Sequence, residues 1–277
     1  MSENLIKHLE GIAFASGESR HYDLNNNIAF RGVTLKHTAG TTPGTNAYVA
    51  NTIFEWIRVY ARGKIIVDLV GDSVAEAIPE AIQLLKEMNR LRQGVGETDE
   101  YFNIVMPQAF PAGHNAYVDW KFRAVGALQT GTVADALVGS VIDIFMDKTP
   151  PKRKVDFRIN SGKFTYGTST GNLGKFINPS EVGFKCAFIM ILVEDDGTNS
   201  DTAIAKITLK KGTDILQEGS IADFRAKTLA KNHIATSTGF AKIPIMRGIG
   251  SNDLQLIAYI SSAGTAIDLH WLMIQMK

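Results

Sequence analysis

The richest group of metal-ligand side chains in the 277-residue sequence is the acidic stretch "EDDGTNSD" at residues 194–201. It offers the carboxylates of Glu194, Asp195, Asp196 and Asp201. Calcium prefers oxygen ligands of this kind, so the stretch is a weak candidate for a calcium site, including one shared between subunits. The order of its acidic residues does not match an EF-hand loop, and Asp-Gly beside Asn is typical of a hairpin turn. Both interpretations stay open.

The histidines and the cysteine follow no catalytic pattern. No two histidines have the His-Glu-x-x-His or His-x-His spacing of a zinc hydrolase or a bicupin. The six are His8, His21, His37, His114, His233 and His270. We expect His270, beside Trp271 in a strand, to be a hydrogen-bonded or surface residue. The single cysteine, Cys186, excludes an intramolecular disulfide, and its apolar neighbours predict a buried structural thiol.

Two further stretches have some character of phosphate-binding segments. "GTSTGNLGKF" at 167–176 departs from the P-loop pattern, because Ser169 stands where Gly is needed and Phe176 where Ser or Thr is needed. We interpret it as a flexible loop between strands. "PPKRK" at 150–154 is interpreted as a solvated linker, with contact to phosphates of lipid or genome as the alternative. No catalytic residue, cofactor site or firm metal site follows, and we expect the protein not to be an enzyme.

The overall composition is that of a globular protein without a nucleic-acid-binding charge excess. Lys and Arg number 29 against 28 Asp and Glu, a net charge of +1, which disfavours sequence-specific nucleic-acid binding. No secretion signal and no apolar run of membrane-spanning length is evident. Leu5, Ile6, Leu9 and Ile12 have helical spacing, which predicts a short amphipathic N-terminal helix that docks on its own domain or, alternatively, on a lipid surface.

The elements that carry these residues are mostly strands. Short apolar or alternating runs bounded by Gly, Pro, Asn and Thr predict the strands. They cover residues 28–35, 53–61, 100–107, 117–128, 137–147, 155–159, 181–194, 203–211, 241–246, 254–262 and 266–276. Two stretches predict helices: 73–92, with Ser73 and Glu76 as a capping box or a later start near Pro79, and 220–233, with Ser220 as N-cap. Many strands with two helices indicate an all-β sandwich class.

The same order of elements occurs twice. The hairpin "IRVYARGKIIVD" turns at Arg62-Gly63, and "AKITLKKGTDILQEGS" turns at Lys211-Gly212. Each has an apolar strand before it and one helix and three strands behind it. This order predicts two tandem eight-stranded jelly-roll β-sandwiches. We place the N-terminal jelly roll at 1–149, the linker at 150–154 and the C-terminal jelly roll at 155–277, because Pro150-Pro151 cannot join a central ladder.

Particular stretches of both halves resemble one known family. They are "FEWIRVYARGKII", "IQLLKEMNRLRQG", "ITLKKGTDILQEG" and the terminal strand "LHWLMIQMK". The chain resembles the double jelly-roll major capsid proteins of tailless, icosahedral bacteriophages with an internal membrane, of the corticovirus-like and flavobacterial lipid-containing phage type. The resemblance implies a pseudo-hexagonal homotrimer that contacts neighbouring capsomers, penton and minor capsid or membrane proteins, and an internal lipid membrane. It also implies a virion location after synthesis and assembly in the host bacterial cytoplasm.

The leading hypothesis is therefore a self-assembling major capsid protein, whose trimer contacts would bury about 2,000 Å² or more per interface if obligate. The alternative is a two-lobed jelly-roll protein that binds carbohydrate or a receptor, as a lectin or spike does. Trp56, Trp120 and Trp271 lie in predicted strands. We expect most of them in sandwich cores and assign an interface role to any that is exposed.

Overall fold

The chain forms two compact units. The computed structural model describes residues 5–38, 53–70, 78–93, 101–110, 112–113, 115–124, 141–148, 157–177, 184–245, 249–250, 253–261 and 266–277. The first unit comprises residues 1–82 and 97–156, and the second comprises 83–96 and 157–277. The expected linker at 150–154 lies outside the described residues. The expected N-terminal jelly roll, 1–149, included the stretch 83–96, which groups instead with the second unit.

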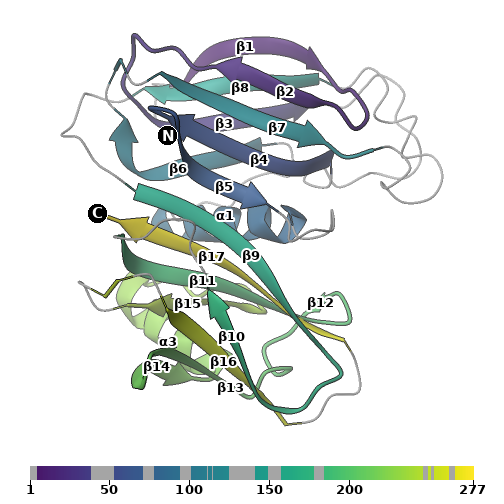
Figure 1. Ribbon diagram of the computed structural model, residues 1–277, viewed down its shortest axis with the longest axis vertical. Helices are drawn as coiled ribbons and strands as arrows, with labels where there is room; N and C mark the ends of the chain where they lie inside the picture. Colours follow the sequence, from purple (N-terminus) through teal and green to yellow (C-terminus); the bar gives the residue numbers. More distant parts are fainter. Residues whose placement is uncertain are drawn as a thin grey trace. The chain divides into compact units, whose positions relative to one another are not determined.

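The first unit is a sandwich of two layers with four strands each (Figure 1). Its strands are β1 (Leu5–Ala13), β2 (Ser19–Asp23), β3 (Phe30–Thr38), β4 (Phe54–Ala61), β5 (Lys64–Val70), β6 (Tyr101–Phe110), β7 (Ala116–Phe122) and β8 (Val141–Lys148). One sheet has the order β1-β8-β3-β6, and the other has the order β5-β4-β7-β2. The described strand pairs in this unit are antiparallel.

The second unit repeats this plan. Its strands are β9 (Phe157–Gly167), β10 (Gly171–Ile177), β11 (Lys185–Asp195), β12 (Thr198–Asn199), β13 (Lys206–Lys211), β14 (Asp214–Gly219), β15 (Phe240–Pro244), β16 (Leu254–Ile260) and β17 (Ile267–Met276). One sheet has the order β10-β16-β13-β14. In the other, β9, β17 and β11 are neighbours and β11 also pairs with β15 and with the two-residue β12.

The two strand orders match when β12 is set aside. If β1 to β8 are equated with β9, β10, β11, β13, β14, β15, β16 and β17, each sheet of one unit has its counterpart in the other. This arrangement, with its two interleaved sheets, is the jelly roll. The helix α1 (Ile78–Gln93) follows β5, and α3 (Ile221–Asn232) follows the equivalent strand β14. The predicted fold, two tandem jelly rolls with one helix after an equivalent hairpin, is confirmed.

The two equivalent hairpins use different turns. Arg62 and Gly63 connect β4 to β5 with φ values of 55° and 69°, as a type I′ turn requires. In the second hairpin Lys211 pairs with Asp214, so the connection is Gly212-Thr213, with φ of 59° at Gly212. The prediction that Lys211 is a turn residue is therefore wrong: it ends β13, and its Nζ donates to the carbonyl of Gly250 at 3.1 Å.

The N-terminal segment is a strand and not the predicted amphipathic helix. β1 pairs with β8, and the register shifts twice, between Lys7 and Leu9 and again between Leu9 and Ile12. Gly11 lies at the second shift with φ of 71°, a conformation typical of a bulge. Each bulge adds one residue to the strand, so the alternation of period two is stretched to the spacing of a helix. This is why the pattern misled the sequence analysis.

The helix starts agree with the sequence chemistry where they are described. Ser220 caps α3: its hydroxyl accepts from the backbone N–H of Asp223 at 3.2 Å, and its own N–H donates to the Asp223 carboxylate at 2.8 Å. The two hydrogen bonds together form a capping box. Helix α1 begins at Ile78, with Pro79 in its first turn, which Pro tolerates. The predicted cap at Ser73 and Glu76 lies outside the described residues.

Each unit has an apolar core between its sheets. In the first unit the rings of Phe54, Trp120 and Phe122 are fully buried and lie within 6.1 Å of one another, centroid to centroid. The core of the second unit includes residues of both sheets and Phe224 of α3, which contacts β15. No described helix is long and apolar enough to cross a membrane.

The central strands of the second unit are buried on both faces. Leu269, Trp271 and Met273 of β17 point into the sandwich core. Leu272 and Ile274, which face the opposite side, are also at most 1% exposed. Helix α1 contributes residues 83–93 to this unit, and the carboxylate of Glu87 accepts from the backbone N–H (2.7 Å) and the hydroxyl (3.1 Å) of Ser237.

Candidate functional site

The acidic stretch 194–201 forms a tight hairpin between β11 and β12. Asp195 pairs with Thr198, which leaves Asp196 and Gly197 as the two connecting residues. Both have positive φ values, 50° and 74°, which Asp-Gly adopts readily. The turn interpretation of this stretch is thus confirmed by the backbone.

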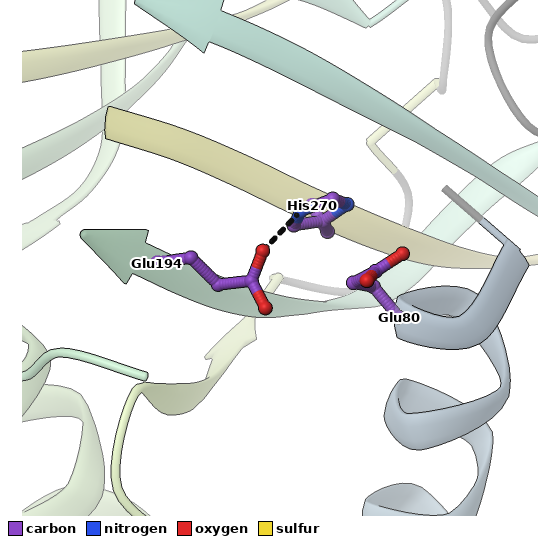
Figure 2. A group of neighbouring side chains, drawn as sticks. All are labelled: Glu80, Glu194 and His270. Carbon is purple, nitrogen blue, oxygen red and sulfur yellow. Dashed lines mark hydrogen bonds and ion pairs between the residues drawn. The ribbon is translucent and has the colours of Figure 1, made fainter. Parts of the chain in front are cut away.

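The outermost carboxylates of the stretch are engaged by protein donors. Glu194 Oε2 lies 2.9 Å from His270 Nε2, the pair joined by the dashed line in Figure 2. Asp201 accepts from the Arg225 guanidinium and, through Oδ1, from the backbone N–H of Gly239 at 2.8 Å. Among the described residues no three of the four carboxylates share one ligand-spaced group. Calcium binding at these residues stays a prediction.

His270 is buried, at 2% exposed, and only one of its ring nitrogens is satisfied by a described partner. Because a carboxylate accepts, Nε2–H donates to Glu194. The Nδ1 atom is buried without a described hydrogen-bond partner. The hydrogen bond links the side chains of β11 and β17, and the imidazole is almost fully shielded from solvent. The expected surface position for His270 is therefore excluded, and the expected hydrogen bond is present.

The thiol of Cys186 and the histidines His233 and His21 have structural surroundings. Cys186 is 2% exposed, and burial raises the pKa of its thiol to about 12. A thiol that is protonated at neutral pH is a poor nucleophile, which agrees with the predicted structural role. His233 ends α3 in the left-handed conformation, with φ of 59°. His21 Nδ1 lies 2.6 Å from Asp119 Oδ1. His114 lies outside the described residues.

The glycine-rich stretch 167–176 is a turn followed by a strand, joining strands of two different sheets, and not a phosphate loop. β9 runs to Gly167 and β10 starts at Gly171, so only residues 168–170 connect them. β10 pairs along its whole length with β16. Most of the predicted loop is therefore a strand. Its glycines made the sequence resemble a loop.

The outer side of the β5-β4-β7-β2 sheet carries aromatic and charged side chains, and we call it the first-unit face. Its positions alternate with the buried positions of the same strands. It consists of His21, Asp23, Glu55, Trp56, Arg58, Tyr60, Asp68, Tyr117, Asp119 and Lys121. Tyr60 and Tyr117 stack with centroids 4.4 Å apart, and the Arg58 guanidinium lies 5.0 Å from the Trp56 ring.

Of the three tryptophans, only Trp56 lies outside the two cores. Trp120 and Trp271 are 0% and 7% exposed, whereas Trp56 is half-buried on the first-unit face. A bulge between Phe54 and Trp56 switches the strand from inward to outward pointing at this residue. Trp56 is the most exposed of the three tryptophans, so it is the one to which an interface role is assigned.

The outer side of the β10-β16-β13-β14 sheet, the second-unit face, carries exposed apolar side chains. Its rows run across the four strands at positions that alternate with the core. The members are Asn172, Gly174, Phe176, Lys206, Thr208, Lys210, Ile215, Glu218, Gln255, Ile257 and Tyr259. Phe176 and Ile215 are each 57% exposed and Tyr259 is 39% exposed. Of the large apolar residues exposed in the described chain, only Leu229, on α3, lies elsewhere.

The sequence analysis missed Phe176 and Ile215 because both lie in strands that it described poorly. β10 was interpreted as a loop, and the alternation of β14 is interrupted by a bulge opposite Leu209 and Lys210. With the hairpin register known, the alternation of apolar and polar positions would have placed both side chains outside the core.

Comparison with known proteins identifies the fold. No protein-family model matches the sequence, and no curated protein does either. Solved structures do match. The major capsid protein P2 of bacteriophage PM2 aligns over 97% of this chain and 96% of its own, with a TM-score of 0.62 and 11% identity. A chain of Sulfolobus Turreted Icosahedral Virus aligns over 99% of this chain and 90% of its own, with a TM-score of 0.65 and 10% identity.

A third solved structure belongs to the same group. The PBCV-1 virus capsid protein aligns over 98% of this chain and 94% of its own, with a TM-score of 0.58 and 9% identity. The resemblance predicted from sequence is confirmed at the level of the fold, which is that of the double jelly-roll major capsid proteins. Identities of 9–11% concern the fold and leave the function to be argued from the chain itself.

Proposed function

We propose that this protein is a major capsid protein that assembles with copies of itself into an icosahedral shell. The observation that carries the proposal is the tandem repeat of the complete jelly-roll strand order within a chain that aligns from end to end with capsid proteins. A lectin or a receptor-binding domain needs one sandwich for its site. Two sandwiches with the same strand order give one chain two similar outer surfaces, as repeated contacts within a shell require.

The assembly unit we propose is a homotrimer. Three chains with two jelly rolls each supply six similar sandwiches, and a closed ring of six approximates a hexagon. Such a tile meets its neighbours through repeated, similar edges. We further propose that the shell surrounds an internal lipid membrane, that penton and minor capsid or membrane proteins complete it, and that the chain is made and assembled in the cytoplasm of a bacterial host.

The chemistry of the described residues supports a structural role. The buried imidazole of His270 is paired with Glu194, and the Cys186 thiol is held in its protonated form. The exposed features of the described chain are instead sheet faces with aromatic and apolar side chains. Surfaces of that kind make protein contacts.

The mass of the purified protein in solution tests the proposal. Light scattering coupled to size exclusion should give a species of about 90 kDa, three times the chain mass of 30.2 kDa. A protein that stays at the mass of one chain and is retained on a sugar-bearing column would instead support the carbohydrate-binding alternative and would exclude the capsid function.

A further inference from the structure

The second-unit face is exposed in the single chain and has the properties of a surface that contacts another protein. Phe176 and Ile215 are more than half exposed, and Tyr259 and Ile257 lie on the same outer side. The β-strand register puts Phe176, Gln255, Lys210 and Ile215 in one row, so the two apolar residues lie on the outer strands β10 and β14 with polar side chains between them. Exposed apolar side chains interspersed with polar ones are typical of a protein interaction site.

The first-unit face differs from the second-unit face in carrying a net negative charge. It carries the carboxylates of Asp23, Glu55, Asp68 and Asp119 against the two permanent cations Arg58 and Lys121, which leaves a charge of −2. Asp68 is paired with Arg58 at 3.0 Å, and Glu55 with Lys121 at 2.8 Å.

Within the described part of the chain, two carboxylates of the first-unit face pair with no permanent cation. They are Asp23, with a side chain 84% exposed, and Asp119, which lies against the His21 ring. The unsatisfied negative charge of this face is therefore concentrated at the end of the sheet formed by β2 and β7.

The second-unit face has the opposite sign. Lys206 and Lys210 stand against the single carboxylate of Glu218, which leaves a charge of +1. Glu218 accepts from the Thr208 hydroxyl at 2.9 Å, a bond that lowers its pKa, and it lies 3.5 Å from Lys206. Lys210 is left as the cation of the row that contains Phe176 and Ile215.

We propose that the second-unit face of one chain docks on the first-unit face of a second copy of the same chain. Apolar Phe176, Ile215 and Tyr259 meet the aromatic Trp56, Tyr60 and Tyr117, and the positive face meets the negative one. The contact joins two different surfaces, so it is head-to-tail, and repeated around an axis it closes a ring. The inference rests on the proposed capsid function and names the surfaces through which the trimer forms.

Substitution with a matched control tests the contact. Phe176→Ser with Ile215→Ser removes two apolar side chains from the face, and Leu229→Ser removes one of similar exposure, 48%, from α3. We expect the double variant to shift the mass from about 90 kDa to that of one chain, or to raise the concentration for half-assembly at least about tenfold. We expect the Leu229 variant to stay assembled, and all variants to keep the circular dichroism spectrum of the folded wild-type chain because the replaced side chains are exposed.

Cysteine cross-linking between copies tests the pairing of faces. Cys186 is buried, so introduced cysteines are the reactive ones. A chain with Tyr259→Cys mixed with a chain with Tyr117→Cys should give a cross-linked product that neither chain gives alone. The charge reversal Lys210→Glu should weaken assembly, and adding Asp23→Lys should restore part of it.

The outcomes separate this inference from the function on which it rests. If the wild-type protein assembles while the Phe176 and Ile215 variant assembles equally well, or if only Tyr259→Cys cross-links to itself, the docking of these two faces is wrong and the capsid function stands. If the wild-type protein is a single chain at all concentrations, both the proposed function and this contact are overturned.

Discussion

Gly162 of β9 is the position where adding one methyl group should be costly. It pairs across the sheet with Trp271 of β17, whose indole ring lies over the glycine. A Cβ at residue 162 would lie 2.5 Å from Cζ2 and 2.7 Å from Cε2 of that ring. Ordinary contact begins at 3.4 Å, so the ring or the strand must move by about 0.9 Å.

The ring has little room to move. Trp271 is 7% exposed and belongs to the core cluster of the second unit, with neighbours on both sheets. Overpacking a core in this way costs about 1–3 kcal/mol. At a urea dependence of about 2 kcal/mol per molar, a loss of about 2 kcal/mol lowers the unfolding midpoint by about 1 M. We expect this shift for Gly162→Ala.

Gly174 of β10 supplies the matched control. A Cβ there would also have a 2.5 Å contact, but with Nε2 of Gln255, the far end of a flexible side chain on the outer side of the sheet. Gln255 can turn away, so Gly174→Ala should change the unfolding free energy by less than about 0.5 kcal/mol. Urea unfolding followed by tryptophan fluorescence and circular dichroism at one protein concentration compares the two.

A double variant tests whether the loss of unfolding free energy in Gly162→Ala comes from contact with the Trp271 ring. Trp271→Phe removes the atoms that the new methyl group meets, so Gly162→Ala should cost less in that background, with a coupling of at least about 0.5 kcal/mol. The reasoning is refuted if Gly162→Ala is as mild as Gly174→Ala, or if its cost is unchanged when residue 271 is Phe.

Three further predictions concern the second unit. Ser220→Ala should lower the unfolding free energy by about 1 kcal/mol in denaturant titrations, since it removes the cap of α3, whereas Ser169→Ala in the exposed β9–β10 turn should have little effect. Hydrogen bonds from Ser220 lower the pKa of Asp223, so this carboxylate stabilises the fold above its ordinary pKa of 3.8 and the contribution is lost as the pH falls through the lowered value. Midpoints measured from pH 2 to 6 should therefore depend less on pH in Asp223→Asn, and identical profiles would contradict this. Cys186 should resist a thiol reagent in the folded protein and react at one thiol per chain after unfolding, because burial raises the pKa of its thiol to about 12; rapid labelling of the folded chain would contradict its burial.

The fold class was predictable because each jelly roll has local signals at equivalent places. Glycine marks the turn of the equivalent hairpin in both units, and the Ser220–Asp223 capping box marks the helix start in the second. Those signals depend on turn and helix-start chemistry, which acts over a few residues. The order of strands behind them then follows from the number and spacing of the apolar runs.

The errors come from features that depend on tertiary structure. Two bulges give β1 the spacing of a helix, and a glycine-rich sequence hides β10, which the pairing with β16 holds as a strand. The stretch 83–96 follows the first hairpin in sequence and groups with the second unit, where Glu87 binds Ser237, 150 residues further along. Partners so distant in sequence leave no local pattern.

The candidate surfaces were only partly predictable. The sequence analysis named the acidic stretch 194–201, which is a hairpin with two protein-bound carboxylates. It allowed an exposed tryptophan an interface role, and the structure singles out Trp56. Which face of a sheet an apolar residue occupies depends on register, and register is set by bulges that a single sequence does not reveal.

Electron microscopy of the purified protein tests the central claim most directly. A chain with two jelly rolls that closes as a trimer should give particles with six lobes and, on concentration, sheets or shells in which these particles pack with hexagonal neighbours. Two-lobed single particles that never associate, at concentrations where the mass measurement also gives 30.2 kDa, would contradict the account.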